Sequence, residues 1–375
     1  MLSDGMRTNG VGRRGLLTGL GVVLVLCAMS GAGHVSADTL YWDGSESGSW
    51  NDIDNWDTSG TGGVSPAALP GEIDDVKFHV AGAANLDTVL GESLTVMSVE
   101  FLSSATSPVT VSIGSSLALN SIGGTVSVAS GSGSHTIATG IQMHSGTHTF
   151  MVQDPAATLT MRSLSNSSNH RAPHMVFDGV GSITITEFLK TRAGGTLTKN
   201  GTGILTIAGL LNGGGQGGMI VNGGTLLMNG STVNTFPLTV NDGGTLGGTG
   251  TMGGTDTAVT ITSGGTLDAG IDGIGTLGTG PLTFEEGATN RVDINGESND
   301  LIEVTGDLTL AGTIVPVLGD EFTTGSYPIM TYTGAFTNNG VVIDEPPQLR
   351  AELTTTGGVV RLAILPPLGT VIQVF

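Results

Sequence analysis

Short apolar runs separated by glycine pairs fill the middle of the chain. Residues 219–221, 238–240 and 259–261 read Met-Ile-Val, Leu-Thr-Val and Val-Thr-Ile, and such β-rich runs favour short strands. Asn, Asp or Ser follows shortly after each run, and a glycine pair and Thr-Leu come next, so a tight turn leads into another strand. Almost no window places apolar residues at helical spacing. The pattern therefore predicts an all-β chain.

This turn-and-strand phrase returns about every 20 residues. Aligned on their apolar position, Ile204, Leu226, Leu246 and Leu267 are 22, 20 and 21 residues apart. That length suits one coil of a parallel β-solenoid, in which no coil buries its own apolar face and each packs on its neighbours. We expect a right-handed parallel β-helix, with the leucines stacked as a core and threonines or asparagines paired along the outside.

The two ends of the chain differ from the repeats. All three tryptophans lie within residues 38–80, which predicts an N-terminal cap of aromatic side chains, although a sugar-stacking surface would use the same residues. Residues 81–312 carry the repeats, blurred at first and glycine-dense from 194 onward. Prolines interrupt the strands of residues 313–375, which predicts a C-terminal β cap followed by a short tail.

Residues 1–37 have the pattern of an export signal. Three arginines precede an apolar stretch, and small residues lead up to a cleavage position near Ala37. The general secretory and twin-arginine routes both stay open. Cys27, the only cysteine, lies in this segment, so the mature chain forms no disulfide. We expect no integral membrane segment after it.

The net negative charge of the chain excludes some classes of binding partner. The chain carries 32 acidic and 12 basic residues, and removal of the signal leaves a net charge of −22. Such a surface repels nucleic acid and anionic lipid headgroups, so neither is an expected partner.

Candidate catalytic carboxylates are few and scattered. Asp74 and Asp75 form one candidate pair, and Asp52 and Asp54 form another, because glycoside hydrolysis needs two carboxylates at a set separation. The acidic residues of the clean repeats are Asp242, Asp256, Asp268, Asp272, Glu285 and Glu286. No histidine or basic motif accompanies them, so we expect no enzyme, no catalytic residue and no cofactor.

Histidine and calcium motifs are also incomplete. Five histidines fall in one window: His135, His144, His148, His170 and His174. An even spacing would put His144 and His148 on one face of a strand, yet nothing nearby completes a ligand set, so metal binding by these histidines stays open. The calcium motif suggested by Gly253-Gly254-Thr255-Asp256 does not repeat, and loops such as Asp52-Ile53-Asp54 or Asn299-Asp300 are weak candidates for a single ion. No metal site is predicted.

The repeats resemble a known family. Residues 195–209, GTLTKNGTGILTIAG, followed by residues 220–230, IVNGGTLLMNG, are similar to the autotransporter-associated β-strand repeat. Residues 246–254 and 306–312 look like the same passengers. The resemblance implies an exported bacterial protein whose repeats form a passenger-like β-helix. The residues after the repeats are too few for a translocator barrel, so surface attachment and release both stay open.

These observations favour a structural or adhesive role. We expect an exported β-solenoid of the bacterial cell surface or extracellular matrix that acts by multivalent contacts rather than by catalysis. Surface polysaccharides and other envelope components are the candidate partners, and the sequence names neither a ligand nor an oligomeric state. The alternative is a β-helix enzyme acting on polysaccharide, or a carbohydrate-binding protein.

Overall fold

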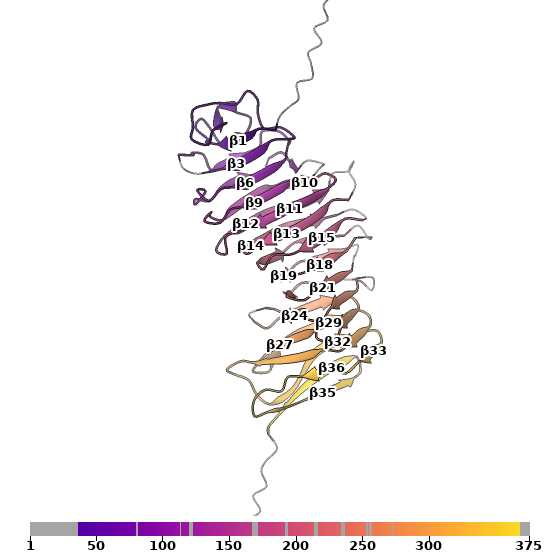
Figure 1. Ribbon diagram of the computed structural model, residues 1–375. Coiled ribbons are helices and arrows are strands. Elements are labelled where there is room, and N and C mark those ends of the chain that lie inside the picture. The colour runs from indigo at the N-terminus through magenta and orange to yellow at the C-terminus, as the bar shows by residue number, and fades with distance from the viewer. Residues whose placement is uncertain are drawn as a thin grey trace, which may run out of the picture. The chain divides into compact units, whose positions relative to one another are not determined.

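The computed structural model describes residues 37–367, apart from 80–81, 113, 120–122, 167–171, 192–193, 214–216, 234–236, 253, 255–256 and 272. Strands dominate this part of the chain, together with one short 3-10 helix, Ile53–Asn55, and no α-helix occurs in it (Figure 1). The prediction of an all-β chain is confirmed. The predicted export signal, apart from Ala37, lies outside the described residues.

The first sheet is a long parallel ladder. Each strand pairs with the strand one coil before it and one coil after it, as the stacked arrows of Figure 1 show. Its parallel strands are β1 (Thr39–Trp42), β3 (Asp75–Phe78), β6 (Ser98–Phe101), β9 (Thr125–Val128), β11 (Thr147–Val152), β13 (His174–Gly179), β15 (Thr196–Lys199), β18 (Met219–Val221), β21 (Leu238–Val240), β23 (Val259–Ile261), β26 (Leu282–Phe284), β30 (Leu308–Leu310) and β33 (Phe336–Asn338). The short strand β2 (Trp56–Asp57) pairs antiparallel with β1. The predicted strands at 219–221, 238–240 and 259–261 are therefore confirmed.

A second ladder runs along the next face of the coil. Its strands are β4 (Asp87–Val89), β7 (Thr110–Ser112), β10 (His135–Met143), β12 (Thr158–Asn166), β14 (Ser182–Lys190), β16 (Ile204–Ile207), β19 (Gly224–Met228), β22 (Gly244–Gly248), β24 (Thr266–Ala269), β27 (Thr289–Asn295), β31 (Thr313–Leu318) and β34 (Val342–Ile343). The pairing is parallel throughout, which confirms the parallel β-solenoid.

The third face closes each coil. Its strands are β5 (Leu94–Val96), β8 (Leu117–Leu119), the later halves of β10, β12 and β14, then β17 (Leu210–Asn212), β20 (Ser231–Val233), β25 (Thr276–Thr279), β29 (Leu301–Val304) and β32 (Gly325–Tyr332). Thr251 bridges Ser231 and Gly278 between β20 and β25. The register of β10 against β12 shifts between Ile137 and Gly140, where the strand passes from one face to the next.

The leucine column predicted from the repeat exists, with one correction. Leu226, Leu246 and Leu267 are paired in register and fully buried. Ile204, however, pairs with Thr225 and is 40% exposed, while the next residue, Leu205, pairs with Leu226 and is buried. The first phrase has one more residue in its turn, and a slip of one residue moves a side chain to the opposite face of a strand.

The turns that precede these leucines need glycine. Gly243 and Gly264 occupy equivalent places in successive coils, and both have a φ of 78°, which residues with a Cβ rarely adopt. Asparagines stack on the same corner, because Asn222 Nδ2 donates to Asn200 Oδ1 at 2.9 Å and Asn241 Nδ2 donates to Asn222 Oδ1 at 2.8 Å. The expected asparagine pairing along the outside is therefore confirmed for these three coils.

Aromatic side chains fill the core of the first coils. The three tryptophans are at most 1% exposed, and their rings pack at right angles, with centroids 5.0 Å apart for Trp42 and Trp56 and 5.1 Å apart for Trp50 and Trp56. Each indole N–H has an acceptor; that of Trp50 donates to Thr88 Oγ1 at 2.9 Å. Phe78 stacks on the ring of Phe101 in the next coil. These tryptophan faces are covered by protein and not open to a sugar.

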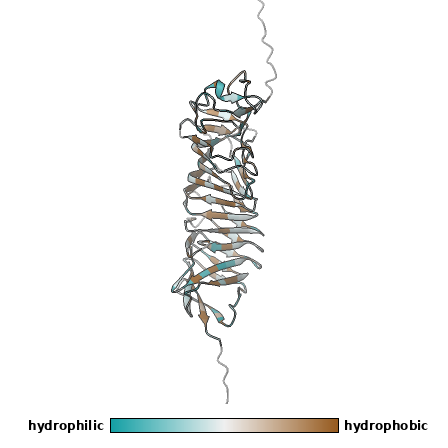
Figure 2. Cartoon of the chain, turned by 90° about the vertical axis from the view of Figure 1, so that its left-hand side faces the viewer, coloured by the Kyte–Doolittle hydropathy of each residue, from teal (hydrophilic) through white to brown (hydrophobic). Residues whose placement is uncertain are grey.

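The chain leaves the coil pattern after β34. The strand β36 (Val359–Leu365) lies between β32 and β35 (Arg350–Thr356) and pairs antiparallel with both. Hydrophobic and hydrophilic stretches are interleaved along the stacked strands, as Figure 2 shows. No helix among the described residues is long and apolar enough to cross a membrane.

Candidate functional site

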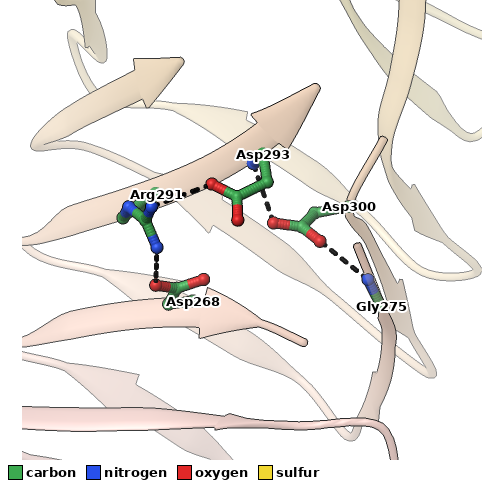
Figure 3. Close-up of polar contacts among 5 residues, drawn as sticks. All are labelled: Asp268, Gly275, Arg291, Asp293 and Asp300. Atoms are coloured by element: carbon green, nitrogen blue, oxygen red, sulfur yellow. Dashed lines mark hydrogen bonds and ion pairs between the residues drawn. The ribbon is translucent and has the colours of Figure 1, made fainter. Parts of the chain in front are cut away.

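Three aspartates from neighbouring coils bring their carboxylates together on the outer side of the second face. They are Asp268 in β24, Asp293 in β27 and Asp300 just before β29. One oxygen from each carboxylate lies within 4.8 Å of the other two. In Figure 3, Asp293 lies between Arg291 and Asp300, and Asp268 lies below Arg291. This is the candidate acidic site of the described residues.

The parallel register places the arginine. The pairing of β24 with β27 sets Arg291 opposite Asp268, and Asp293 shares the face of Arg291 because it is two residues further along the strand. One terminal guanidinium nitrogen of Arg291 contacts Asp268 Oδ2 at 2.5 Å, and the other contacts Asp293 Oδ1 at 3.1 Å. The guanidinium therefore bridges two carboxylates of adjacent coils.

Asp300 is the most buried member, at 2% exposed. Its Oδ1 accepts from the backbone N–H of Gly275 and its Oδ2 from that of Asp293, both at 2.8 Å. Burial raises the pKa of Asp300 to about 7, the nearby charges of Asp293 and Asp268 add to this rise, and the two backbone donors oppose it. Asp300 therefore changes its charge near neutral pH.

A hollow of about 290 Å³ opens beside this group. Asp293 and Asn295 line it together with apolar side chains that include Ile274, Ile294 and Leu318. Its volume is at the low end for ligand pockets. Asp293 thus lies between the buried carboxylates and this hollow.

The arrangement suits a structural link better than chemistry on a substrate. A glycosidase needs an acid of raised pKa that reaches the substrate, whereas both oxygens of Asp300 are buried and engaged by backbone donors. Calcium needs several free oxygens, whereas Arg291 already engages Asp268 and Asp293. The group holds β24, β27 and the turn before β25 together.

The other predicted carboxylates are held by local structure: Asp54 lies in the 3-10 helix, and Asp75 begins β3, where it accepts from Ser98 Oγ of the next coil. Asp52 accepts from the backbone of Asp54 at 3.3 Å and caps the 3-10 helix. Asp74 accepts from the backbone N–H groups of Asp38 and Gly71 at 2.9 and 2.8 Å. These partners are backbone N–H groups, of which that of Asp38 belongs to the preceding coil, so the contacts order turns and join neighbouring coils. Asp256 and Asp272 lie outside the described residues.

Two of the histidines belong to the core. His135 and His148 are at most 1% exposed, and the Nδ1 atom of each accepts a backbone N–H, from Val109 at 3.1 Å and from Gly124 at 3.0 Å. Their Nε2 atoms therefore carry the proton, and that of His148 donates to the carbonyl of His144 at 3.0 Å. Both roles are structural, because each ring links neighbouring segments of backbone.

The expectation that His144 and His148 share one strand face is wrong. His144 follows β10 and His148 lies in β11, and the turn between them contains Gly146 with a φ of 107°. His174 is exposed and its Nδ1 lies 2.8 Å from Thr196 Oγ1. His170 is outside the described residues.

One buried cation was missed by sequence reasoning. Lys199 occupies the core column of the first face, between Phe177 and Val221, and is 3% exposed. Its ammonium group donates to the carbonyls of Gly201 and Gly223. Burial lowers the pKa of Lys199 to about 8, and the charge of Asp178 acts in the opposite direction. The alternation Thr-Leu-Thr-Lys, which continues the inward positions through Lys199, is the signal that could have identified it.

Comparison with known proteins supports the repeat assignment. No protein-family model matches the chain. The chain is 33% identical over 205 residues to the adhesin BmaC autotransporter of Brucella suis biovar 1 (strain 1330). The match covers 51% of this chain and 6% of the adhesin, so the chain spans a small part of that relative's length. Together, the parallel solenoid and this similarity fit an autotransporter passenger-like β-helix protein.

Proposed function

We propose that the protein is an adhesive solenoid of the bacterial surface or extracellular matrix, and that it acts by contact rather than by catalysis. The similarity to an adhesin supports an exported, adhesin-like role. The observation that carries the proposal is the register of the coils, because it repeats the same kind of outward side chain once per strand. Residues 81–312 would be the contact region, with residues 38–80 and 313–375 protecting its two ends.

Repetition is the physical basis of the adhesion. One exposed threonine or asparagine contributes little to binding, but equivalent side chains on successive coils meet a repeating partner together. Once the first contact forms, the next ones form at high effective concentration, so avidity exceeds the affinity of any one contact. The stacked backbone ladders keep these contacts in fixed positions without disulfides.

Adhesion can be tested with beads coated with residues 38–375. We expect these beads to be retained on bacterial cells under flow more strongly than albumin-coated beads, with retention rising steeply with coating density. Retention equal to that of albumin at every density would contradict the proposal.

A polysaccharide-active enzyme is the competing function. The raised pKa of Asp300 beside two other carboxylates is the observation in its favour. Incubation of the protein with uronate polymers, followed by an assay for new reducing ends and unsaturated products, is expected to give no turnover. Appreciable turnover, lost in Asp300→Asn, would replace the adhesive proposal.

A further inference from the structure

A column of threonines marks the outer side of the first face. The first-face strands β21, β23, β26, β30 and β33 are each three residues long, and in the first four the central side chain points outward between two buried ones, while the central side chain of β33 is exposed. Register pairs these central residues from coil to coil. The column, called here the threonine column, consists of Thr239, Thr260, Thr283, Thr309 and Thr337.

The hydroxyl groups of this column are available to a ligand. Their side chains are partly or fully exposed, and none of them hydrogen-bonds to another group within the described residues. Strand spacing of about 4.7–4.9 Å sets the interval between them. Branching at Cβ restricts threonine χ1, so the hydroxyl and methyl groups repeat in an ordered way.

Charge limits what this column can meet. The column itself is uncharged, while exposed carboxylates lie at its borders: Asp242 closely follows β21, and Glu285 and Glu286 follow β26. In a chain with a net charge of −20, these carboxylates repel anionic polymers and accept hydrogen bonds from hydroxyl groups. A hydroxyl-rich, uncharged partner fits this environment.

We propose that the threonine column binds a linear, uncharged polysaccharide whose chain runs along the stack of coils. A single file of hydroxyls matches a single extended polymer better than a broad flat surface, because each strand contributes one outward residue. Sugar hydroxyls then pair with threonine hydroxyls on successive coils, and the border carboxylates exclude uronates. This proposal rests on the adhesive function proposed above and names its ligand class.

The second face provides a matched control. It also carries a file of outward threonines, Thr225, Thr245, Thr266, Thr289 and Thr313. Two residues further along each strand, the outward positions change from Leu227 to Gly247, Asp268 and Arg291. The surface beside this file is therefore irregular and partly charged, unlike the narrow first face. Substitutions here reproduce the chemical change without altering the threonine column.

The test compares two triple variants of the mature chain. Thr239→Val, Thr260→Val and Thr283→Val together remove three hydroxyls of the threonine column and keep its shape, while Thr245→Val, Thr266→Val and Thr289→Val do the same on the second face. Co-sedimentation with microcrystalline cellulose, a neutral glucan, measures binding, and immobilised polygalacturonate serves as the anionic probe. Circular dichroism checks that both variants keep the fold.

We expect the unaltered protein to bind cellulose and not polygalacturonate. The first-face variant should bind cellulose at least about tenfold more weakly, and the second-face variant should bind unchanged. No binding to cellulose, stronger binding to polygalacturonate, or equal binding by the two variants would overturn the proposal. Coated beads that still adhere to cells in that case would leave the adhesive function standing and remove only this ligand assignment.

Discussion

Protonation of His135 should destabilise the first coils in mild acid. The ring stacks on Phe101 with centroids 4.2 Å apart and planes 7° apart. Its Nδ1 accepts from Val109, and its Nε2 donates at 2.9 Å to Ser132, whose hydroxyl donates to Ala105 at 3.1 Å. A proton on Nδ1 would remove the acceptor that Val109 needs and leave a charge buried in the core.

The magnitude follows from the shift in pKa. Burial lowers the pKa of His135 from 6.5 to about 4. Below pH 6.5 the unfolded chain takes up a proton that the folded chain refuses, so stability falls as the pH falls from 6.5 through 4 and changes no further from this group below that. At 1.36 kcal/mol per pH unit, the loss is about 3 kcal/mol. His148, whose pKa is also lowered by burial, acts in the same direction.

The assay compares His135→Gln, which is neutral at every pH, with the unaltered protein. Guanidinium unfolding is followed by tryptophan fluorescence at pH 7, 5.5 and 4, because the rings of Phe78 and Phe101 connect the tryptophans of the first coil to His135. The free energy of unfolding should fall by about 3 kcal/mol less in the variant between pH 7 and pH 4. His174→Gln, at an exposed histidine, is the control and should follow the unaltered protein. Equal pH dependence in His135→Gln and the unaltered protein would refute the reasoning.

Three further substitutions test the core and the acidic group. Leu246→Ala should lower the free energy of unfolding by about 2–5 kcal/mol in chemical denaturation, because the side chain is fully buried, and a loss below about 1 kcal/mol would contradict its core position. Lys199→Met should raise the thermal midpoint at pH 7, because the folded chain disfavours the charged amine below pH 10.5. This gain should vanish as the pH rises from 8 to 10.5, where the amine of the unaltered protein loses its charge. A lower midpoint at pH 7 would argue against a costly buried charge. Arg291→Gln should lower the free energy of unfolding by roughly 2–4 kcal/mol, because the buried Asp268 carboxylate loses its cation. Arg350→Gln, at an exposed ion pair, should change the free energy of unfolding little. Equal effects of the two substitutions would show that the acidic group is not a structural link.

Local patterns predicted the fold well, because each coil repeats the same turn and strand. The glycine turns and the alternation around residues 219–261 were enough to place three strands and the Leu226, Leu246 and Leu267 column. The assignment of Ile204 to this column failed, since one additional turn residue reverses the facing of a strand and composition does not reveal it.

The acidic group was harder to predict because its members are distant in sequence. Asp268 and Arg291 are 23 residues apart, close to one coil, so counting by coil length could have paired them. Asp300 reaches the group because the chain turns back between β27 and β28 (Ser298–Asn299), which pair antiparallel. The repeat pattern does not predict this turn. The burial of His135 and Lys199 was not predicted for a different reason. A polar residue in the sequence is usually assigned to a turn, and its inward position becomes evident only from the strands of the adjacent coils.

Pulsed electron paramagnetic resonance tests the solenoid most directly, because the mature chain has no cysteine and accepts pairs of spin labels at chosen sites. One label at Thr158 is combined with a second at Thr245, Thr266, Thr289 or Thr313, which lie four to seven coils further along one outer column. The distance should rise by about 4.8 Å with each step, from about 19 to about 34 Å. Distances that do not rise in equal steps would contradict the parallel, in-register stack.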